Sequence, residues 1–262
     1  VGFTGYFCCG MGRPIHRTSH RREKTIVYQG RTIFTHWSRL ADALHFQKNR
    51  NFLLIAMRFC WFLAICFTLA CGRHEPNTPT DEHSASEPQV ARAEHLVWKA
   101  RVNFEQRRLE ATASWLIKKA PGAQRIVFDT YDLAILEVFT TAGTPAKWQL
   151  GDSIPFLGRA LTVEIDDQTE WVHIKYLSKS GAKGLQWLEA HQTQGKQHPF
   201  LFSQGQAVLT RSWLPCQDSP GLRFSFEAEV EVPKGLMAVM SAENPNALSP
   251  QGKYRFENKK PI

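Results

Sequence analysis

The feature that most constrains the fold is a series of short segments in which apolar residues recur at every second position. In the first of these segments, Leu96, Trp98, Ala100 and Val102 are each two residues apart. A period of two places alternate side chains on opposite faces of a strand, so this pattern predicts a half-buried β-strand. Further candidate strands are residues 109–117, 125–129, 133–139, 161–165, 171–177, 222–232 and 235–241.

Turn signals separate these candidate strands, and the whole pattern indicates an all-β fold. A Pro-Gly pair at residues 121–122 and the paired aspartates Asp166 and Asp167 are typical of turns. Many short strands at this spacing predict an antiparallel sandwich or a curved, saddle-like sheet. Only residues 184–190 suggest a short helix.

Charge is distributed unevenly, which argues against nucleic acid as a ligand. The formal net charge is +8, but residues 1–56 hold nine Lys/Arg and two Asp/Glu, a net of +7, and Arg58 adds one more. Residues 72–262 hold 22 residues of each sign and are neutral. The basic character therefore belongs to the segment that precedes the predicted β domain.

Residues 57–71 are typical of a bacterial lipoprotein signal peptide. Met57 and Arg58 precede an apolar run of twelve residues, shorter than the roughly 20 residues that a membrane span needs. The run ends in Leu69-Ala-Cys71-Gly72, which predicts lipidation of Cys71, although Thr68 stands where an aliphatic residue is usual. The expected location is the bacterial cell envelope, at the outer membrane or the periplasmic face. The alternative is a membrane anchor over residues 52–71.

These signals divide the chain into four segments. Residues 1–56 are interpreted as an over-extended, non-native segment, with a basic nucleic-acid arm as the alternative. Residues 57–71 form the signal peptide. Residues 72–93 are rich in Pro, Ser, Thr and Glu and predict a flexible, disordered tether. Residues 94–262 form the β domain.

No complete set of metal ligands or catalytic groups is visible in the sequence. Zinc peptidases need two histidines one helical turn apart with a glutamate beside the first. His74-Glu75 is followed by Pro76 and no second histidine, and the chain has no CxxC pair. We therefore predict no catalytic residue and no metal site in this chain.

Several blocks in a fixed order resemble the segment ahead of the catalytic domain in zinc aminopeptidases of the leukotriene A(4) hydrolase, aminopeptidase B and aminopeptidase N family. The resemblance covers residues 93–262. Its strongest parts are Leu185-Gln-Trp-Leu188, His198-Pro-Phe-Leu-Phe-Ser-Gln-Gly-Gln206, residues 211–220 and residues 232–241. The Gln-x-Gln sequence is similar to the leukotriene A(4) hydrolase and aminopeptidase B branch, because aminopeptidase N-type enzymes carry a glutamate there.

The resemblance implies that the chain is the N-terminal substrate-cleft domain of an enzyme that hydrolyses N-terminal residues from peptides. It places Gln204, Gly205 and Gln206 in the peptide-binding cleft, where the Gln206 carboxamide could accept hydrogen bonds from the substrate ammonium group. Gly205 stands where vertebrate members have cysteine. The implied partners are a peptide N-terminus, a C-terminal catalytic domain that holds zinc, and a membrane reached through the lipid anchor. The chain alone is expected to be inactive and to bind no zinc.

Two alternatives stay open at this stage. One is a non-catalytic, lipid-anchored β-sandwich that binds peptides or glycans, and the other is a scaffold subunit. The segment Arg211–Pro220 is interpreted as structural: Asp218 caps a turn or pairs with Arg211, and Trp213 supplies packing. Cys216 has no neighbouring base and is expected to be a small buried residue.

Overall fold

The structure is a computed structural model that describes residues 81–262. The predictions for residues 1–56, for the signal peptide and for Cys71 lie outside the described residues, as does the start of the tether. The prediction of a disordered tether is wrong for its last residues: 91–93 begin a strand, and Ser84 and Ala85 donate hydrogen bonds to the Asp129 carboxylate. No helix within the described part of the chain is long and apolar enough to cross a membrane.

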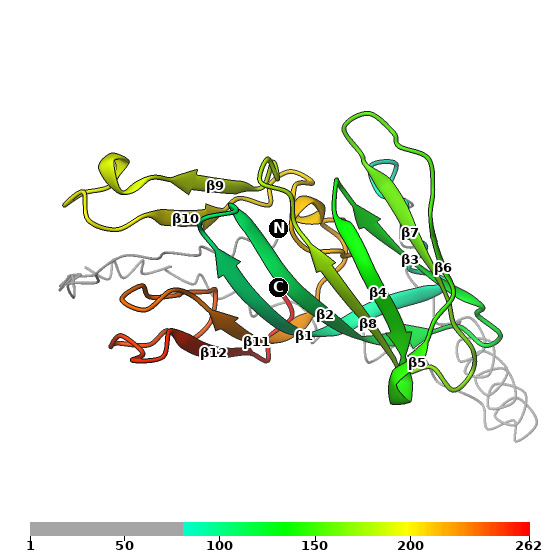
Figure 1. Cartoon of the computed structure of the whole chain (residues 1–262). Helices are drawn as coiled ribbons and strands as arrows, with labels where there is room; N and C mark the ends of the chain where they lie inside the picture. Colours follow the sequence, from blue (N-terminus) through cyan, green and yellow to red (C-terminus); the bar gives the residue numbers. More distant parts are fainter. Residues whose placement is uncertain (1–80) are drawn as a thin grey trace, which may run out of the picture. The chain divides into compact units, whose positions relative to one another are not determined.

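The expectation of an all-β fold is confirmed, and the strands form three sheets (Figure 1). The largest has seven strands in the order β12 (Lys253–Asn258), β11 (Ser225–Glu231), β1 (Ala91–Asn103), β2 (Arg108–Lys119), β8 (Trp171–Leu177), β4 (Ala134–Thr140) and β5 (Thr144–Pro145). A three-stranded sheet has the order β3 (Arg125–Thr130), β7 (Arg159–Glu164) and β6 (Trp148–Leu150), and β9 (Leu185–Leu188) pairs with β10 (Phe200–Ser203). Three 3-10 helices complete the elements: η1 (Thr141–Gly143), η2 (Ala190–Gln192) and η3 (Thr210–Ser212).

The long hairpin of β1 and β2 forms the centre of the large sheet. Its two strands pair from Ala91↔Lys119 to Asn103↔Arg108, with one register shift between Ala93 and His95. Strand β11 pairs with β1 in parallel, which makes the sheet mixed and not purely antiparallel. A parallel pair requires a long crossover connection, and here the chain between β1 and β11 contains most of the domain.

Two local predictions are wrong. Residues 184–190 contain strand β9 and not a helix, because Leu185–Leu188 pairs with Phe200–Ser203 in an antiparallel ribbon. A short apolar run fits either period, so its partner decides its conformation. Residues 235–241 form no strand, and their burial does not alternate, because Met237 is buried together with Leu236, Ala238 and Met240. In that segment the Leu236 N–H donates to the Pro233 carbonyl at 3.1 Å, and the Met240 N–H donates to Asn244 Oδ1 at 2.7 Å.

The inner face of the large sheet packs against the segment that contains η3. Trp98 donates from Nε1 to the Tyr176 hydroxyl at 2.9 Å, and that hydroxyl donates to the Trp213 carbonyl at 2.9 Å. Trp115 donates from Nε1 to the Pro215 carbonyl at 3.0 Å. Trp98, Trp115, Tyr176 and Trp213 are all buried to 1% exposure or less. The resembling segment 211–220 therefore contributes Trp213, Leu214 and Cys216 to the hydrophobic core.

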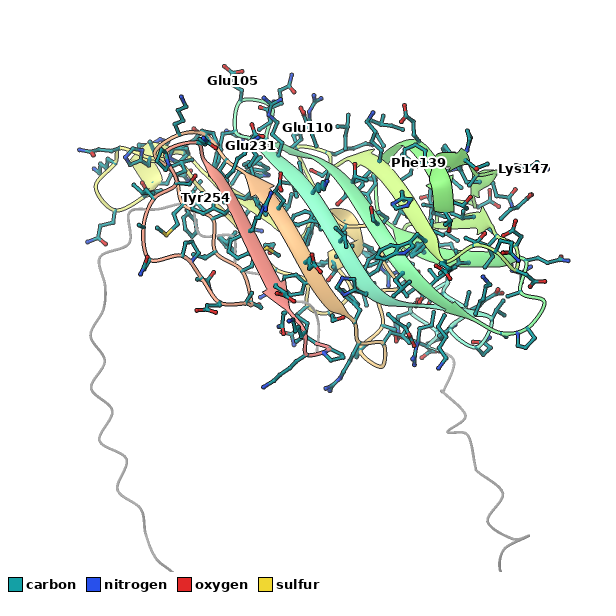
Figure 2. All side chains as sticks on the ribbon, turned by 90° about the horizontal axis from the view of Figure 1, so that it is seen from below. Glu105, Glu110, Phe139, Lys147, Glu231 and Tyr254 are labelled. Carbon is teal, nitrogen blue, oxygen red and sulfur yellow. The ribbon has the colours of Figure 1, made fainter. Side chains whose placement is uncertain are left out.

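The outer face of the large sheet carries charged side chains, among them Glu227, Glu229 and Glu231 on alternate positions of β11. Glu229 pairs with Arg255 across the sheet at 3.3 Å, and Glu231 lies 3.6 Å from Arg101. Figure 2 shows side chains of this kind standing on the strands, with Glu110 and Glu231 labelled. These exposed pairs contribute little to the free energy of unfolding.

We predict that Tyr176→Phe lowers the free energy of unfolding by about 1–3 kcal/mol, because it removes a buried hydroxyl that both accepts and donates a hydrogen bond. Urea denaturation of the 262-residue chain measures this loss. Tyr131→Phe is the matched control, since Tyr131 is only partly buried and contributes its ring face to Lys183. Equal stability of the two variants would contradict a central role for the Tyr176 hydroxyl.

Candidate functional site

The three residues expected to line a cleft lie together in the loop that follows β10. Gly205 is buried, Gln204 is half-buried and Gln206 is exposed. The Gln206 N–H donates to Gln204 Oε1 at 3.1 Å, so the Gln204 carboxamide acts inside the loop. The Gln206 carboxamide makes no hydrogen bond within residues 81–262. It is therefore the group of the three that is available to a ligand.

A continuous set of hydrogen bonds fixes the shape of this loop. The Gln204 N–H donates to the Gly184 carbonyl at 2.8 Å, and the Gly184 N–H donates to Ser212 Oγ at 2.8 Å. Ser212 Oγ in turn donates to the Leu209 carbonyl at 2.7 Å. The circuit closes because the Leu209 N–H donates to the Gly205 carbonyl at 2.8 Å. The loop that presents Gln206 is thus tied both to itself and to the start of β9.

Gly184 is required at its place in this circuit by close packing. A Cβ atom there would lie 2.6 Å from the Leu209 carbonyl oxygen and 2.9 Å from Trp213 Cδ1. The sequence interpretation did not single out Gly184 or Ser212. The only available signal is the position of Gly184 directly before the resembling block that begins at Leu185.

A buried guanidinium anchors the other end of the loop. Arg211 is 1% exposed, and its Nε donates to Asp218 Oδ2 at 3.1 Å, as the sequence interpretation allowed. Its Nη1 donates to the Leu157 carbonyl at 3.0 Å, and its Nη2 donates to the carbonyls of His83 at 2.9 Å and Asp218 at 3.0 Å. One side chain therefore joins segments that are far apart in the sequence.

A second carboxylate completes this buried cluster. Asp129 Oδ1 lies 3.7 Å from Arg211 Nη1, and Asp129 also accepts from Ser84 Oγ, from the Ala85 N–H and from the Asp218 N–H. Burial raises the pKa of Asp218, and the nearby guanidinium of Arg211 opposes that rise. Two carboxylates around one cation make the cluster dependent on Arg211 for its stability.

Cys216 lies in the same region and has no features of a nucleophile. It is 2% exposed, and burial together with the charges of Asp218 and Asp129 raises the pKa of its thiol well above the usual value. A thiol that stays protonated reacts slowly. The interpretation of Cys216 as a small buried residue is confirmed.

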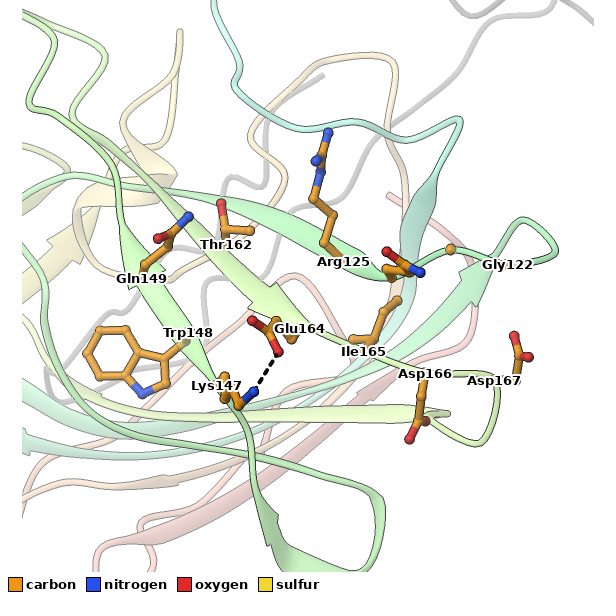
Figure 3. Close-up of a pocket in the computed structure, with 12 residues that line it drawn as sticks. Gly122, Arg125, Lys147, Trp148, Gln149, Thr162, Glu164, Ile165, Asp166 and Asp167 are labelled. Carbon is orange, nitrogen blue, oxygen red and sulfur yellow. Dashed lines mark ion pairs between the residues drawn. The ribbon is translucent and has the colours of Figure 1, made fainter.

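A separate surface hollow of about 750 Å³ lies over the three-stranded sheet (Figure 3). Its wall includes Arg125, Lys147 and Glu164, together with Trp148 on the edge strand. Lys147 pairs with Glu164 at 3.7 Å, and Arg125 pairs with Glu87 at 2.8 Å. Both cations are thus neutralised by neighbours, and none of Gln204, Gly205 and Gln206 lines this hollow.

The described residues do not fit a zinc ion. No group of three or more His, Cys, Asp or Glu side chains within residues 81–262 could hold a metal. The half-buried His173, for example, pairs through Nδ1 with Ser114 Oγ at 2.8 Å, and burial lowers the pKa of its imidazole.

Comparisons with known proteins agree on one family. Residues 92–262 match the model of the peptidase M1 N-terminal domain. Leukotriene A-4 hydrolase of Xenopus laevis is 35% identical over 193 residues, and leucine aminopeptidase 2 of Aspergillus terreus is 29% identical over 197 residues. These alignments cover 70% and 71% of this chain but 32% of each relative.

Solved structures show the same fold. The yeast leukotriene A4 hydrolase in complex with bestatin superposes with a TM-score of 0.64 at 27% identity, covering 72% of this chain and 30% of that one. An M1 zinc metallopeptidase of Deinococcus radiodurans superposes with a TM-score of 0.50 at 17% identity, covering 66% of this chain and 40% of that one, a likeness of fold alone. The chain therefore spans about a third of the length of the curated relatives that it matches.

We predict that Arg211→Met lowers the free energy of unfolding by about 3–5 kcal/mol near neutral pH, because it leaves two buried carboxylates without their cation. Without Arg211 the folded-state pKa of Asp218 rises further above its unfolded value. Stability gained from protonating that group is present at low pH and lost as the pH rises. The deficit of the variant should therefore grow between about pH 4 and pH 7.

Chemical denaturation across this pH range measures the effect, with Arg255→Met as the matched control. The Arg255 side chain is 86% exposed and pairs with Glu229 on the sheet surface, so its loss should change stability by less than about 0.5 kcal/mol. A deficit for Arg211→Met that is small or independent of pH would contradict the role assigned to this cluster.

Proposed function

Because the chain belongs to the family of peptidase M1 N-terminal domains, we propose that it forms one wall of the substrate cleft of a zinc aminopeptidase. In this proposal the enzyme removes N-terminal residues from peptides, and Gln206 contacts the free amine of the substrate. The observation that carries the proposal is the exposed, unengaged carboxamide of Gln206 in a loop that is held by hydrogen bonds of Gln204, Gly205 and Leu209.

The chemistry of a carboxamide suits this role. Its carbonyl oxygen accepts hydrogen bonds from an ammonium group, and its NH₂ can donate to a neighbouring acceptor. An amide supplies a dipole and not a full charge, so a carboxylate elsewhere in the cleft would complete recognition of the amine. This domain contributes by positioning the Gln206 carboxamide, because the hydrogen-bond circuit through Gly184 and Ser212 restricts the loop that carries it.

We use "parent protein" for the proposed longer protein that contains this chain. In the proposal, zinc binds to the part of the parent protein outside this chain. Zinc bound there would polarise the scissile carbonyl and activate water. Residues 81–262 hold no suitable ligand group, so their role is to bind and orient the peptide.

The proposed location is the bacterial cell envelope, with the domain held at a membrane through a lipid on Cys71. This part of the proposal is supported by the apolar run before Leu69-Ala-Cys71-Gly72 and by the polar composition of the segment that follows.

We predict that Gln206→Ala in the parent protein lowers kcat/KM for aminoacyl p-nitroanilides about 10- to 100-fold, because a hydrogen bond to a charged group contributes about 1.5–3 kcal/mol. Gln206→Glu keeps an acceptor and adds a charge, so it should retain more activity than the alanine variant. Steady-state kinetics measures both effects, and the 262-residue chain alone should be inactive in the same assay.

The matched control for this experiment is Gln251→Ala, which removes another exposed glutamine from the turn before β12. It should leave kcat/KM unchanged within about twofold. Equal activity of the Gln206→Ala, Gln251→Ala and unmodified parent proteins would show that Gln206 does not contact the substrate amine.

We predict that Cys71 carries a lipid in a bacterial host. Metabolic labelling with an alkyne fatty acid should mark the protein, and Cys71→Ser should abolish the label. Cys66→Ser, which changes a cysteine inside the apolar run, should retain it. Labelling that persists in the Cys71→Ser variant would contradict the lipoprotein interpretation.

A further inference from the structure

The loop between β6 and β7 exposes apolar side chains in an unusual way. Phe156 is 80% exposed and Ile154 is 52% exposed, the two highest values among the large apolar residues of the described chain. This connection continues beyond the ends of both strands (Figure 1). Scattered apolar residues on a surface are ordinary, but two at one loop tip form a small apolar projection.

The backbone makes this exposure costly. Residues 154–157 form a tight turn, in which the Leu157 N–H donates to the Ile154 carbonyl at 3.2 Å. Pro155 takes the second position and Phe156 the third, where φ is +67°. A turn with proline followed by positive φ favours glycine at its third position. A phenylalanine there has an unfavourable backbone conformation and a ring that is mostly exposed.

The turn is nevertheless held firmly. Ile154 and Gly158 exchange two backbone hydrogen bonds, at 2.8 and 2.9 Å. Gly158 packs so closely on β3 that a Cβ atom there would lie 2.1 Å from the Thr130 carbonyl oxygen. The carbonyl of Leu157 accepts from the buried Arg211. The projection therefore depends on the same guanidinium that anchors the loop of Gln206.

A cation lies beside the projection without a carboxylate partner. Lys183 Nζ is 5.8 Å from the centre of the Phe156 ring and 4.4 Å from that of Tyr131, and it makes no ion pair within residues 81–262. Lys183 directly precedes Gly184, whose carbonyl accepts from the N–H of Gln204. Phe156 is therefore linked to the Gln204 loop by one ring contact to Lys183, one peptide bond to Gly184 and one hydrogen bond to the Gln204 N–H.

We propose that Phe156 and Ile154 form a docking knob that inserts into an apolar socket, edged by carboxylates that pair with Lys183, on the zinc-bearing part of the parent protein. This inference rests on the proposed function. It commits to that occupant for two reasons. The relatives are about three times as long as the matched region, which leaves ample protein to cover the knob. The knob also shares its anchor with the loop proposed to line the cleft.

The test compares the 262-residue chain with the full parent protein by site-resolved hydrogen exchange and thermal unfolding. In the parent, the backbone amides of residues 153, 154 and 156–158 should exchange at least tenfold more slowly than in the chain alone. Phe156→Gly relieves the backbone, so it should leave the Tm of the chain unchanged or higher. The same substitution should lower the Tm of the parent. Lys183→Glu should lower the Tm of the parent as well.

Lys196→Gly is the matched control, because Lys196 is an exposed residue that also has positive φ, at +51°, but has no apolar ring. It should not lower the Tm of either protein. Equal exchange rates in chain and parent, with no loss of Tm in the Phe156→Gly parent, would overturn the proposal. Phe156-dependent binding of the chain to anionic phospholipid vesicles would overturn it in favour of a membrane surface.

The outcome is separable from that of the proposed function. A parent protein that holds zinc and hydrolyses aminoacyl p-nitroanilides, yet leaves residues 153–158 unprotected, would refute the docking knob alone. A parent that holds no zinc and has no such activity would refute the aminopeptidase proposal, whatever the exchange rates at the knob.

Discussion

The arrangement of this domain depends on the buried guanidinium of Arg211. Its N–H groups reach the carboxylate of Asp218 and the backbone carbonyls of His83, Leu157 and Asp218. A planar guanidinium offers five donors in a fixed geometry, which allows one side chain to join several segments at once. Burial of the charge is tolerated because two carboxylates surround it, and removal of one partner from such a cluster is costly.

The anchor at Arg211 explains why the exposed side chains of Gln206 and Phe156 can be held in fixed positions. Gln206 exposes a carboxamide from a loop that is fixed by the hydrogen-bond circuit through Gly184 and Ser212. Phe156 exposes a ring from a turn whose carbonyl is held by Arg211. Rigid presentation reduces the entropy lost on binding, which is the contribution that a non-catalytic wall can make to a peptide site.

Periodicity in the sequence predicted the strands that have one buried face, such as β1, β2 and β8, because alternation records burial directly. It failed where apolar side chains are buried but the backbone does not hydrogen-bond to a neighbouring strand. Leu236, Ala238 and Met240 are buried, yet the Leu236 N–H donates to the Pro233 carbonyl and the Met240 N–H donates to Asn244 Oδ1, so neither group joins a sheet. The pair of Arg211 and Asp218 was predictable because it is local in sequence. The carbonyls of His83 and Leu157 were not, because only the fold brings them to the guanidinium. Gln204, Gly205 and Gln206 were proposed as site residues through the resemblance alone, since nothing in their composition distinguishes them from surface residues.

The central claim is that the loop after β10 faces the N-terminus of a peptide. The measurement that tests it most directly is a crystal structure of the parent protein with a bound peptide whose amine is free. The account predicts that the Gln206 carboxamide oxygen lies about 3 Å from the peptide nitrogen, within hydrogen-bonding distance. A peptide bound on another face of this domain, with Gln206 in bulk solvent, would contradict it.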